Sequence, residues 1–341
     1  MTSEREQPSV AGSLEGHFIR RILVCLDRSA LSEACLPHAI SLSRIFGSSI
    51  TLLHVMQPLQ NGEHTTDAFG WDIARREATA YLERLREQVA KASGQPVEFR
   101  LEQGNPAERI AVLARELGAD LTLLGSRGEG GAAAWNLGST VEHVLGVARG
   151  SVFVVHPASP RVVEGGSPKR ILVPLDGSVR SESVLPAAAQ LANAYGAELV
   201  LSHVVLEPRP NEVLREPEDL QLARDLAVHL ESSAGRYLEH LRDRLAHQVA
   251  SVRAVVLRNP DERQSLLDLS RKERVGLIVL SAHGSSCNPA RLYGSVAEYM
   301  LTHSTIPLLV LQDLPESEIQ RITLQEEAAP PLRASFTAEE V

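Results

Sequence analysis

The sequence predicts an α/β fold of two tandem, doubly wound domains, Rossmann-like or flavodoxin-like, each built on a parallel sheet. Three observations support this fold class. The chain has 341 residues, which is the length of two ordinary domains. Its first half recurs in its second half. Within each half, short apolar runs alternate with amphipathic helical patterns, as they do in parallel sheets that carry helices on both faces.

The repeat is an ordered series of matching segments. The segment 21–29, Arg-Ile-Leu-Val-Cys-Leu-Asp-Arg-Ser, returns 149 residues later as Arg-Ile-Leu-Val-Pro-Leu-Asp-Gly-Ser at 170–178. Farther along, Gly138-Ser139 matches Gly294-Ser295 at an offset of 156. The change of offset predicts a net insertion of seven residues in the second copy, before its long helix.

Hydrophobic periodicity and capping residues place the elements of the first copy. We expect strands at 22–26, 50–55, 97–101, 121–124 and 152–155, and helices at 32–46, 74–94, 106–117 and 140–148. Asn105 is suited to cap the third of these helices, with Pro106 at its first position. The two domains are placed at 18–156 and 168–312, with a linker rich in Pro, Gly and Ser between them and flexible tails at 1–17 and 313–341.

Composition and missing motifs exclude several classes of function. The net charge of −9 argues against a nucleic-acid surface, and no apolar run approaches the ~18 residues of a membrane span. The three cysteines, Cys25, Cys35 and Cys287, have no spacing suited to zinc or to a disulfide framework. We therefore expect a cytoplasmic protein. The sequence contains no P-loop, no dinucleotide-binding glycine fingerprint and no nucleophile elbow.

Candidate ligand residues lie where the strands of the first copy end. In an open parallel sheet, ligands bind beyond the carboxyl ends of the strands, where the strand order reverses. After the fourth strand the chain reads Gly-Ser-Arg-Gly, nine residues, then Gly-Ser at the start of a helix. Glycines let the backbone approach a ligand, and a helix N-terminus favours phosphate. The candidates are Asp27, Val55, Gly125, Arg127, Gly128, Gly138, Ser139 and Thr140.

The second copy carries the same motif with one change. It reads Ser-Ala-His-Gly, nine residues, then Gly-Ser, so that Ser281 replaces the first glycine. A serine narrows the pocket slightly, but its hydroxyl can donate to a phosphate. The candidates in this copy are Asp176, Val204, Ser281, His283, Gly284, Gly294 and Ser295.

These motifs resemble the universal stress protein family, which is marked by an apolar strand, a glycine, two residues, a glycine, nine residues, and then Gly and Ser or Thr. The resemblance covers about 18–156 and 168–312. It implies a five-stranded sheet of order 3-2-1-4-5 in each copy. It also implies ATP or another adenine nucleotide as the ligand, with Mg²⁺ only as a companion of the phosphates. The Asp of strand one and the Val of strand two would position the adenosine, and the glycine motif would hold the phosphates. Cys25 and Arg28 depart from the Pro and Gly that the family often has.

Simpler interpretations of the same residues stay open. A strand-end Asp often only caps the turn that follows it, and glycines after a strand are often only turn residues. His54 and His203 lie on apolar strands, where a structural role is expected. Cys25, Tyr81 and Tyr237 read as core residues.

The functional expectation is an ATP-binding stress-response regulator that acts as a binding module, because no general base is visible for a committed enzyme. Two alternatives are a slow ATPase or autophosphorylating protein, and a nucleotide-free scaffold. The expected partners are an adenine nucleotide and a protein that the sequence does not identify, with no nucleic acid and no membrane. The two copies should pair within the chain through the apolar strands 152–155 and 308–311. A homodimer is a further assembly to consider.

Overall fold

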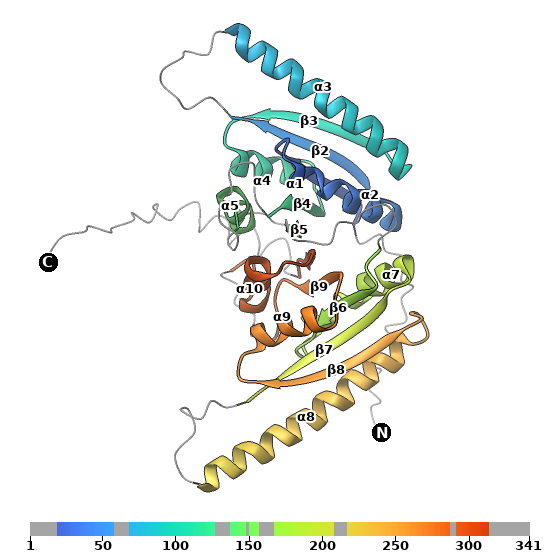
Figure 1. Ribbon diagram of the computed structural model, residues 1–341, viewed down its shortest axis with the longest axis vertical. Helices are drawn as coiled ribbons and strands as arrows, with labels where there is room; N and C mark the ends of the chain where they lie inside the picture. The colour runs from blue at the N-terminus through green and yellow to red at the C-terminus, as the bar shows by residue number, and fades with distance from the viewer. Residues whose placement is uncertain are drawn as a thin grey trace, which may run out of the picture.

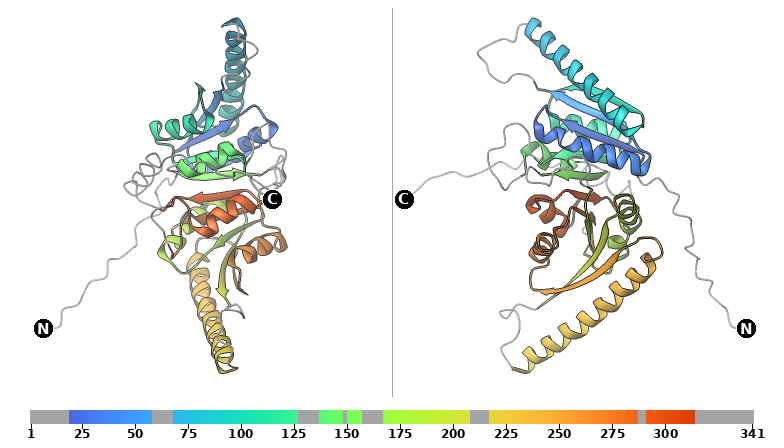
Figure 2. Two further views of the ribbon diagram at one scale, coloured as in Figure 1. Left: turned by 90° about the vertical axis from the view of Figure 1, so that its left-hand side faces the viewer. Right: turned by 45° about the vertical axis from the view of Figure 1, so that its right-hand side comes forward.

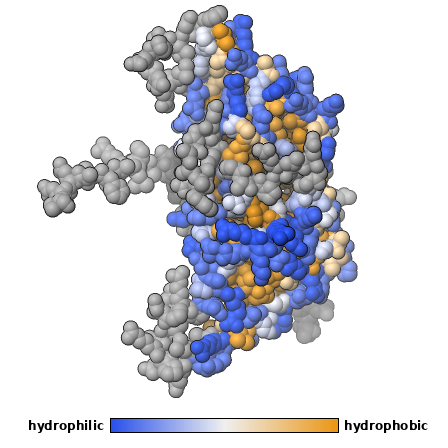
Figure 3. Space-filling view, in the orientation of Figure 1, coloured by the Kyte–Doolittle hydropathy of each residue, from blue (hydrophilic) through white to orange (hydrophobic). Residues whose placement is uncertain are grey.

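The computed structural model describes residues 19–57, 68–126, 137–147, 150–156, 167–207, 217–286 and 291–313. The two copies lie end to end, with the long helices α3 and α8 at opposite ends of an elongated molecule (Figures 1 and 2). Hydrophilic residues are interspersed with small apolar patches on the face shown in Figure 3. Within the described ranges, no helix combines the length and apolar character needed to cross a bilayer.

Strands and helices alternate in both copies. The first copy contains β1 (Arg21–Leu26), α1 (Ala30–Glu33), α2 (Cys35–Phe46), β2 (Ser49–Met56), α3 (Ala68–Ser93), β3 (Val97–Gln103), α4 (Pro106–Glu116), β4 (Leu121–Gly125), α5 (Ser139–Val147) and β5 (Ser151–Val155). The second contains β6 (Arg170–Pro174), α6 (Val179–Glu182), α7 (Leu185–Tyr195), β7 (Glu198–Leu206), α8 (Pro217–Leu245), β8 (Val252–Asn259), α9 (Glu262–Lys272), β9 (Leu277–Ser281), α10 (Ser295–His303) and β10 (Leu308–Leu311).

All strands join one ten-stranded sheet of order β3-β2-β1-β4-β5-β10-β9-β6-β7-β8. Each copy therefore has the order 3-2-1-4-5, and its strands are parallel, so the predicted fold class and strand order are confirmed. The fifth strands β5 and β10 pair antiparallel, with Val154 opposite Leu308. The expected pairing of the two copies through their fifth strands is also confirmed.

The first helical region differs from its prediction. We expected one helix over 32–46, but two helices form, α1 and α2, with Ala34 between them. The Ser29 side chain caps α1 by accepting from the Ser32 amide, and Ser178 caps α6 in the second copy in the same way. Continuous apolar spacing runs through this break, so the periodicity alone could not reveal it.

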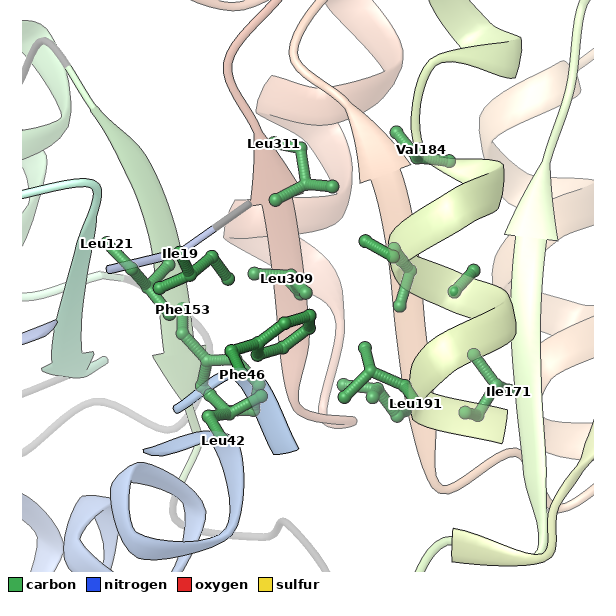
Figure 4. Packing of buried hydrophobic residues seen from close by; sticks show 14 of the residues in the cluster. Ile19, Leu42, Phe46, Leu121, Phe153, Ile171, Val184, Leu191, Leu309 and Leu311 are labelled. Atoms are coloured by element: carbon green, nitrogen blue, oxygen red, sulfur yellow. The ribbon is translucent and has the colours of Figure 1, made fainter. Parts of the chain in front are cut away.

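Helices cover both faces of the sheet, and the apolar core continues across the junction between the copies. Leu42 and Phe46 of α2, Phe153 of β5, Leu191 of α7 and Leu309 of β10 belong to one buried cluster. Figure 4 shows Phe46 and Phe153 beside Leu309. The helices α2 and α7 also meet directly, because Gln190 Nε2 donates to the Ile45 carbonyl oxygen at 3.0 Å.

Candidate functional site

The two copies make the same backbone hydrogen bonds at the carboxyl ends of their strands. In each copy, the backbone amide of a residue at the end of the fourth strand donates to the carbonyl oxygen of the last residue of the fifth strand. The carbonyl oxygen of the donating residue accepts a hydrogen bond from the amide of the glycine in the Gly-Ser pair. The hydrogen bonds are Ser126 N to Val155 O (2.8 Å) and Gly138 N to Ser126 O (2.9 Å), and, in the second copy, Ala282 N to Leu311 O (2.8 Å) and Gly294 N to Ala282 O (2.8 Å). The same hydrogen bonds therefore place the Gly-Ser pair at the start of its helix in both copies.

The strand-one aspartates both bind the turn that follows them. Asp27 Oδ1 accepts from the Ser29 amide at 3.0 Å, and Asp176 Oδ1 accepts from the Ser178 amide at 3.0 Å. The capping role that we had kept open is therefore present in both copies.

In the second copy, the turn after β9 packs directly on Asp176. The Ser285 amide donates to Asp176 Oδ2 at 2.5 Å. A Cβ atom on Gly284 would collide with the same carboxylate, so only glycine allows this approach. Burial alone would raise the pKa of Asp176, but hydrogen bonds from Ser178, Ser285 and Ser181 outweigh burial and lower the pKa to about 2. Asp176 is therefore a fixed negative charge.

A cavity of about 500 Å³ opens at this edge of the second copy. Its volume lies within the range of ordinary small-molecule sites. All the residues chosen from the sequence of the second copy line it: Asp176, Val204, Ser281, His283, Gly284, Gly294 and Ser295. The structure thus brings together residues from the ends of β6, β7 and β9 and from the start of α10.

Further residues line the cavity that the sequence did not indicate. They are chiefly Leu206, Leu230, Ser233, Glu262 and Ser285. Burial, and secondarily the charge of Asp176, raises the pKa of Glu262. Ser285 directly follows Gly284 of the glycine motif, and this position in the sequence could have indicated it. Leu230 belongs to α8, and no sequence motif indicates which residues of this helix face the cavity.

The ring of His283 is engaged by the protein. Its Nδ1 lies 2.9 Å from Asp313 Oδ1, and its Nε2 lies 2.8 Å from the Arg291 carbonyl oxygen. Neither ring nitrogen is left to hold a phosphate, although the residue lines the cavity. Asp313, which we expected to begin a flexible tail, is buried by these contacts.

The first copy presents its candidates on equivalent strands. Asp27 follows β1, Val55 lies near the end of β2, and Gly125 ends β4, and these strands are neighbours with their carboxyl ends at one edge. Ser139 and Thr140 open α5 directly after Gly138. Arg127 and Gly128 lie outside the described residues.

The strand-two histidines both make the structural hydrogen bonds that we expect of them, although His203 also lines the cavity. His54 Nδ1 lies 2.8 Å from the Leu26 carbonyl oxygen, and His203 Nδ1 lies 2.8 Å from that of Leu175. Each ring ties the second strand of its copy to the end of the first. Cys25 is buried, and burial raises the pKa of its thiol. No group of three or more His, Cys, Asp or Glu residues suited to a metal occurs in the part of the chain that the structure describes.

The fold and the cavity define a tandem, doubly wound α/β protein with a ligand-sized site at the carboxyl edge of its second sheet. The chain belongs to the universal stress protein family, whose model matches residues 19–156 and 168–312. It is 26% identical over 297 residues to a universal stress protein of Mycolicibacterium smegmatis, covering 85% of this chain and 96% of that protein. A universal stress protein of Mycobacterium tuberculosis is 24% identical over 302 residues, with the same coverage of 85% and 96%.

Two solved structures share the tandem fold. A putative universal stress protein from Pseudomonas aeruginosa matches with a TM-score of 0.64 at 15% identity, covering 91% of this chain and 99% of that chain. A universal stress protein from Archaeoglobus fulgidus matches with a TM-score of 0.59 at 20% identity, covering 86% of this chain and 98% of that chain. Both likenesses extend over the two copies and support the same architecture.

Proposed function

We propose that this chain is an adenine-nucleotide-binding stress-response regulator with ATP as its ligand. The observation that carries the proposal is the second-copy cavity, because the motif residues chosen from the sequence converge on it. A binding module suits this site better than an enzyme. Two imidazoles line the cavity. That of His283 is bound at both ring nitrogens, and that of His203 is bound at Nδ1 to the Leu175 carbonyl oxygen.

The phosphate end of the site is supported by unsatisfied donors. The helix α10 begins after Gly294, and no side chain caps its first turn. Its first amides therefore remain available to an anion, and the helix dipole favours negative charge there. The buried Ser281 hydroxyl also lines the cavity and has no hydrogen-bond partner among the described residues. These groups fit a phosphate chain.

Different residues of the site would contact the adenosine and the phosphates of the nucleotide. Asp176 and Val204 would position the adenosine, and Ser281, Gly284, Gly294 and Ser295 would hold the phosphates. His283 would take part through its backbone. Mg²⁺ would enter as a companion of the phosphates, since hard cations prefer phosphate and water oxygens. In the first copy, the corresponding roles fall to Asp27, Val55, Gly125, Arg127, Gly128, Gly138, Ser139 and Thr140.

The biological setting follows from the same proposal. Nucleotide occupancy would order the turns at the carboxyl edges and change the surface offered to a protein partner in the cytoplasm. With a net charge of −9, nucleic acid is not proposed as a partner. A membrane is not proposed either.

Isothermal titration calorimetry with ATP tests the proposal. We expect two sites in the unmodified protein, one fewer in Gly294→Val, and one fewer in Gly138→Val. A Cβ at Gly294 lies 3.4 Å from the nearest backbone oxygen, so the chain tolerates it, while the valine methyl groups would obstruct the phosphates. Gly235→Ala, in α8, is the control and should bind as the unmodified protein does. Unchanged ATP binding in Gly294→Val would contradict the proposed site.

A further inference from the structure

A charged cluster joins three strand ends of the second copy; its histidine and aspartate side chains are buried, whereas its arginine side chain is 38% exposed. It consists of Asp313 after β10, His283 after β9 and Arg180 in α6, which follows β6. The His283 side chain is 0% exposed and that of Asp313 is 3% exposed. Since β6, β9 and β10 are neighbouring strands, the cluster lies at the same carboxyl edge as the cavity.

Asp313 is the centre of the cluster. Its Oδ1 accepts from the backbone amide of His283 at 3.0 Å and from the ring Nδ1 of the same residue at 2.9 Å. Its Oδ2 accepts from Arg180 Nη1 at 2.8 Å. Burial would raise the pKa of this carboxyl, but the bonds from His283 and Arg180 lower it, so Asp313 is ionised.

The ring of His283 lies between two hydrogen-bond acceptors. Its Nδ1 faces a carboxylate and its Nε2 faces the carbonyl oxygen of Arg291. Both partners are hydrogen-bond acceptors, so the ring lies between two groups to which a protonated nitrogen can donate. Asp313 contacts the ring and the backbone of the same residue.

The charged groups nearby leave this pairing undisturbed. The Arg291 side chain turns to Glu298, at 3.3 Å, and both are exposed. Asp176 is bound by Ser178 and Ser285. Gln312, between β10 and the cluster, is neutral and donates to the Leu292 carbonyl oxygen. Among these groups, Asp313 is the carboxylate that contacts His283.

We propose that Asp313 is a positioning residue for the ligand site of the second copy, and that it holds the turn 283–285 through the backbone amide and the ring of His283. The inference rests on the proposed function of the cavity that this turn lines. The same turn places Gly284 against Asp176 and delivers the Ser285 amide to that carboxylate. Holding His283 at its backbone and its ring therefore holds the turn that lines the cavity and contacts Asp176.

The first copy lacks the residues for such a cluster. By the offsets of the repeat, its sequence has Leu31, Arg127 and Pro157 where the second copy has Arg180, His283 and Asp313. By its sequence, the first copy therefore cannot build the same three-residue cluster at these positions.

The test uses Asp313→Asn in the full-length chain. Hydrogen–deuterium exchange of the amides of 283–286 should accelerate about tenfold, because a charge-assisted contact is lost. Asp120→Asn is the matched control, since Asp120 accepts from two backbone amides at the opposite edge of the first sheet. It should leave exchange at 283–286 unchanged. Equal exchange in Asp313→Asn and the unmodified protein would overturn the proposal.

Two further readouts separate positioning from mere stability. A ¹⁵N spectrum of the histidine rings, assigned with His283→Gln, should show Nδ1 of His283 protonated, because it faces the Asp313 carboxylate; an unprotonated Nδ1 would overturn the proposal. ATP affinity, measured in a Gly138→Val background, should fall in Asp313→Asn and stay unchanged in Asp120→Asn. Exchange and ring protonation need no nucleotide. If they behave as expected but ATP does not bind, the proposed function fails and the positioning of the turn stands.

Discussion

The turn after strand one shows how the two copies reach one conformation with different residues. Arg28 has a φ of 70°, and Gly177, at the same place in the second copy, has a φ of 83°. Left-handed backbone is costly for any residue that carries a Cβ. The guanidinium of Arg28 lies 6.0 Å from the centroid of the Tyr81 ring, a contact that offsets part of this cost. The first copy therefore carries strain that the second avoids.

We expect Gly177→Ala to lower the free energy of unfolding by about 1–2 kcal/mol, because the alanine must keep a positive φ. Space is not the cause, since nothing lies within 4 Å of a Cβ at this position. Gly235, inside α8, has equally open space but helical backbone. Gly235→Ala should therefore raise stability, by about 0.5–1 kcal/mol. Urea denaturation measures both, and shifts of the same sign would refute the conformational argument.

At the scale of the element, β5 and β10 depend on each other. Val154 and Leu308 are directly opposite in the antiparallel ladder, and both are fully buried in the same apolar cluster. Opposite side chains on one face of a strand pair stabilise each other. The ladder therefore adds side-chain coupling to its hydrogen bonds at the junction of the copies.

A double-mutant cycle should detect this coupling. Val154→Ala and Leu308→Ala should each destabilise the protein, and the double variant should depart from additivity by about 0.5–1 kcal/mol. Val24→Ala supplies the control. Val24 lies on β1, three strands from β10, a separation of roughly 14 Å. The pair Val24→Ala and Leu308→Ala should be additive, and additivity at Val154 and Leu308 as well would argue against direct coupling.

At the scale of the whole molecule, one sheet and one apolar cluster extend through both copies. Domains that share a core cannot lose half of it without exposing the other half. We expect differential scanning calorimetry to show a single transition whose calorimetric and van't Hoff enthalpies agree. Two separate transitions would show that each copy folds independently of the junction.

How far the sequence predicted this molecule depends on how local each signal is. The repeat and the alternation of apolar runs predicted both sheets, and the family resemblance supplied their strand order. The spacing of glycines found the residues that line the cavity. Other features had no local signal. Asp313 follows the last strand in a polar segment, and its partners His283 and Arg180 lie 30 and 133 residues away in the chain. Only the folded sheet brings them together.

Because β5 and β10 belong to one chain, their antiparallel pairing is an intramolecular step and not an association of two molecules. Two separate chains that met through such strands would do so in a second-order step, and dilution would part them. Here the complementary strands belong to one chain, and a tether holds a partner at an effective concentration in the millimolar range. The outer strands left at the ends of the sheet, β3 and β8, carry charged side chains such as Glu98, Arg100 and Arg253. Charged outer strands discourage further edge-to-edge growth. Fusion thus makes the pairing of the two copies independent of protein concentration, and the charged outer strands limit the sheet to these two copies.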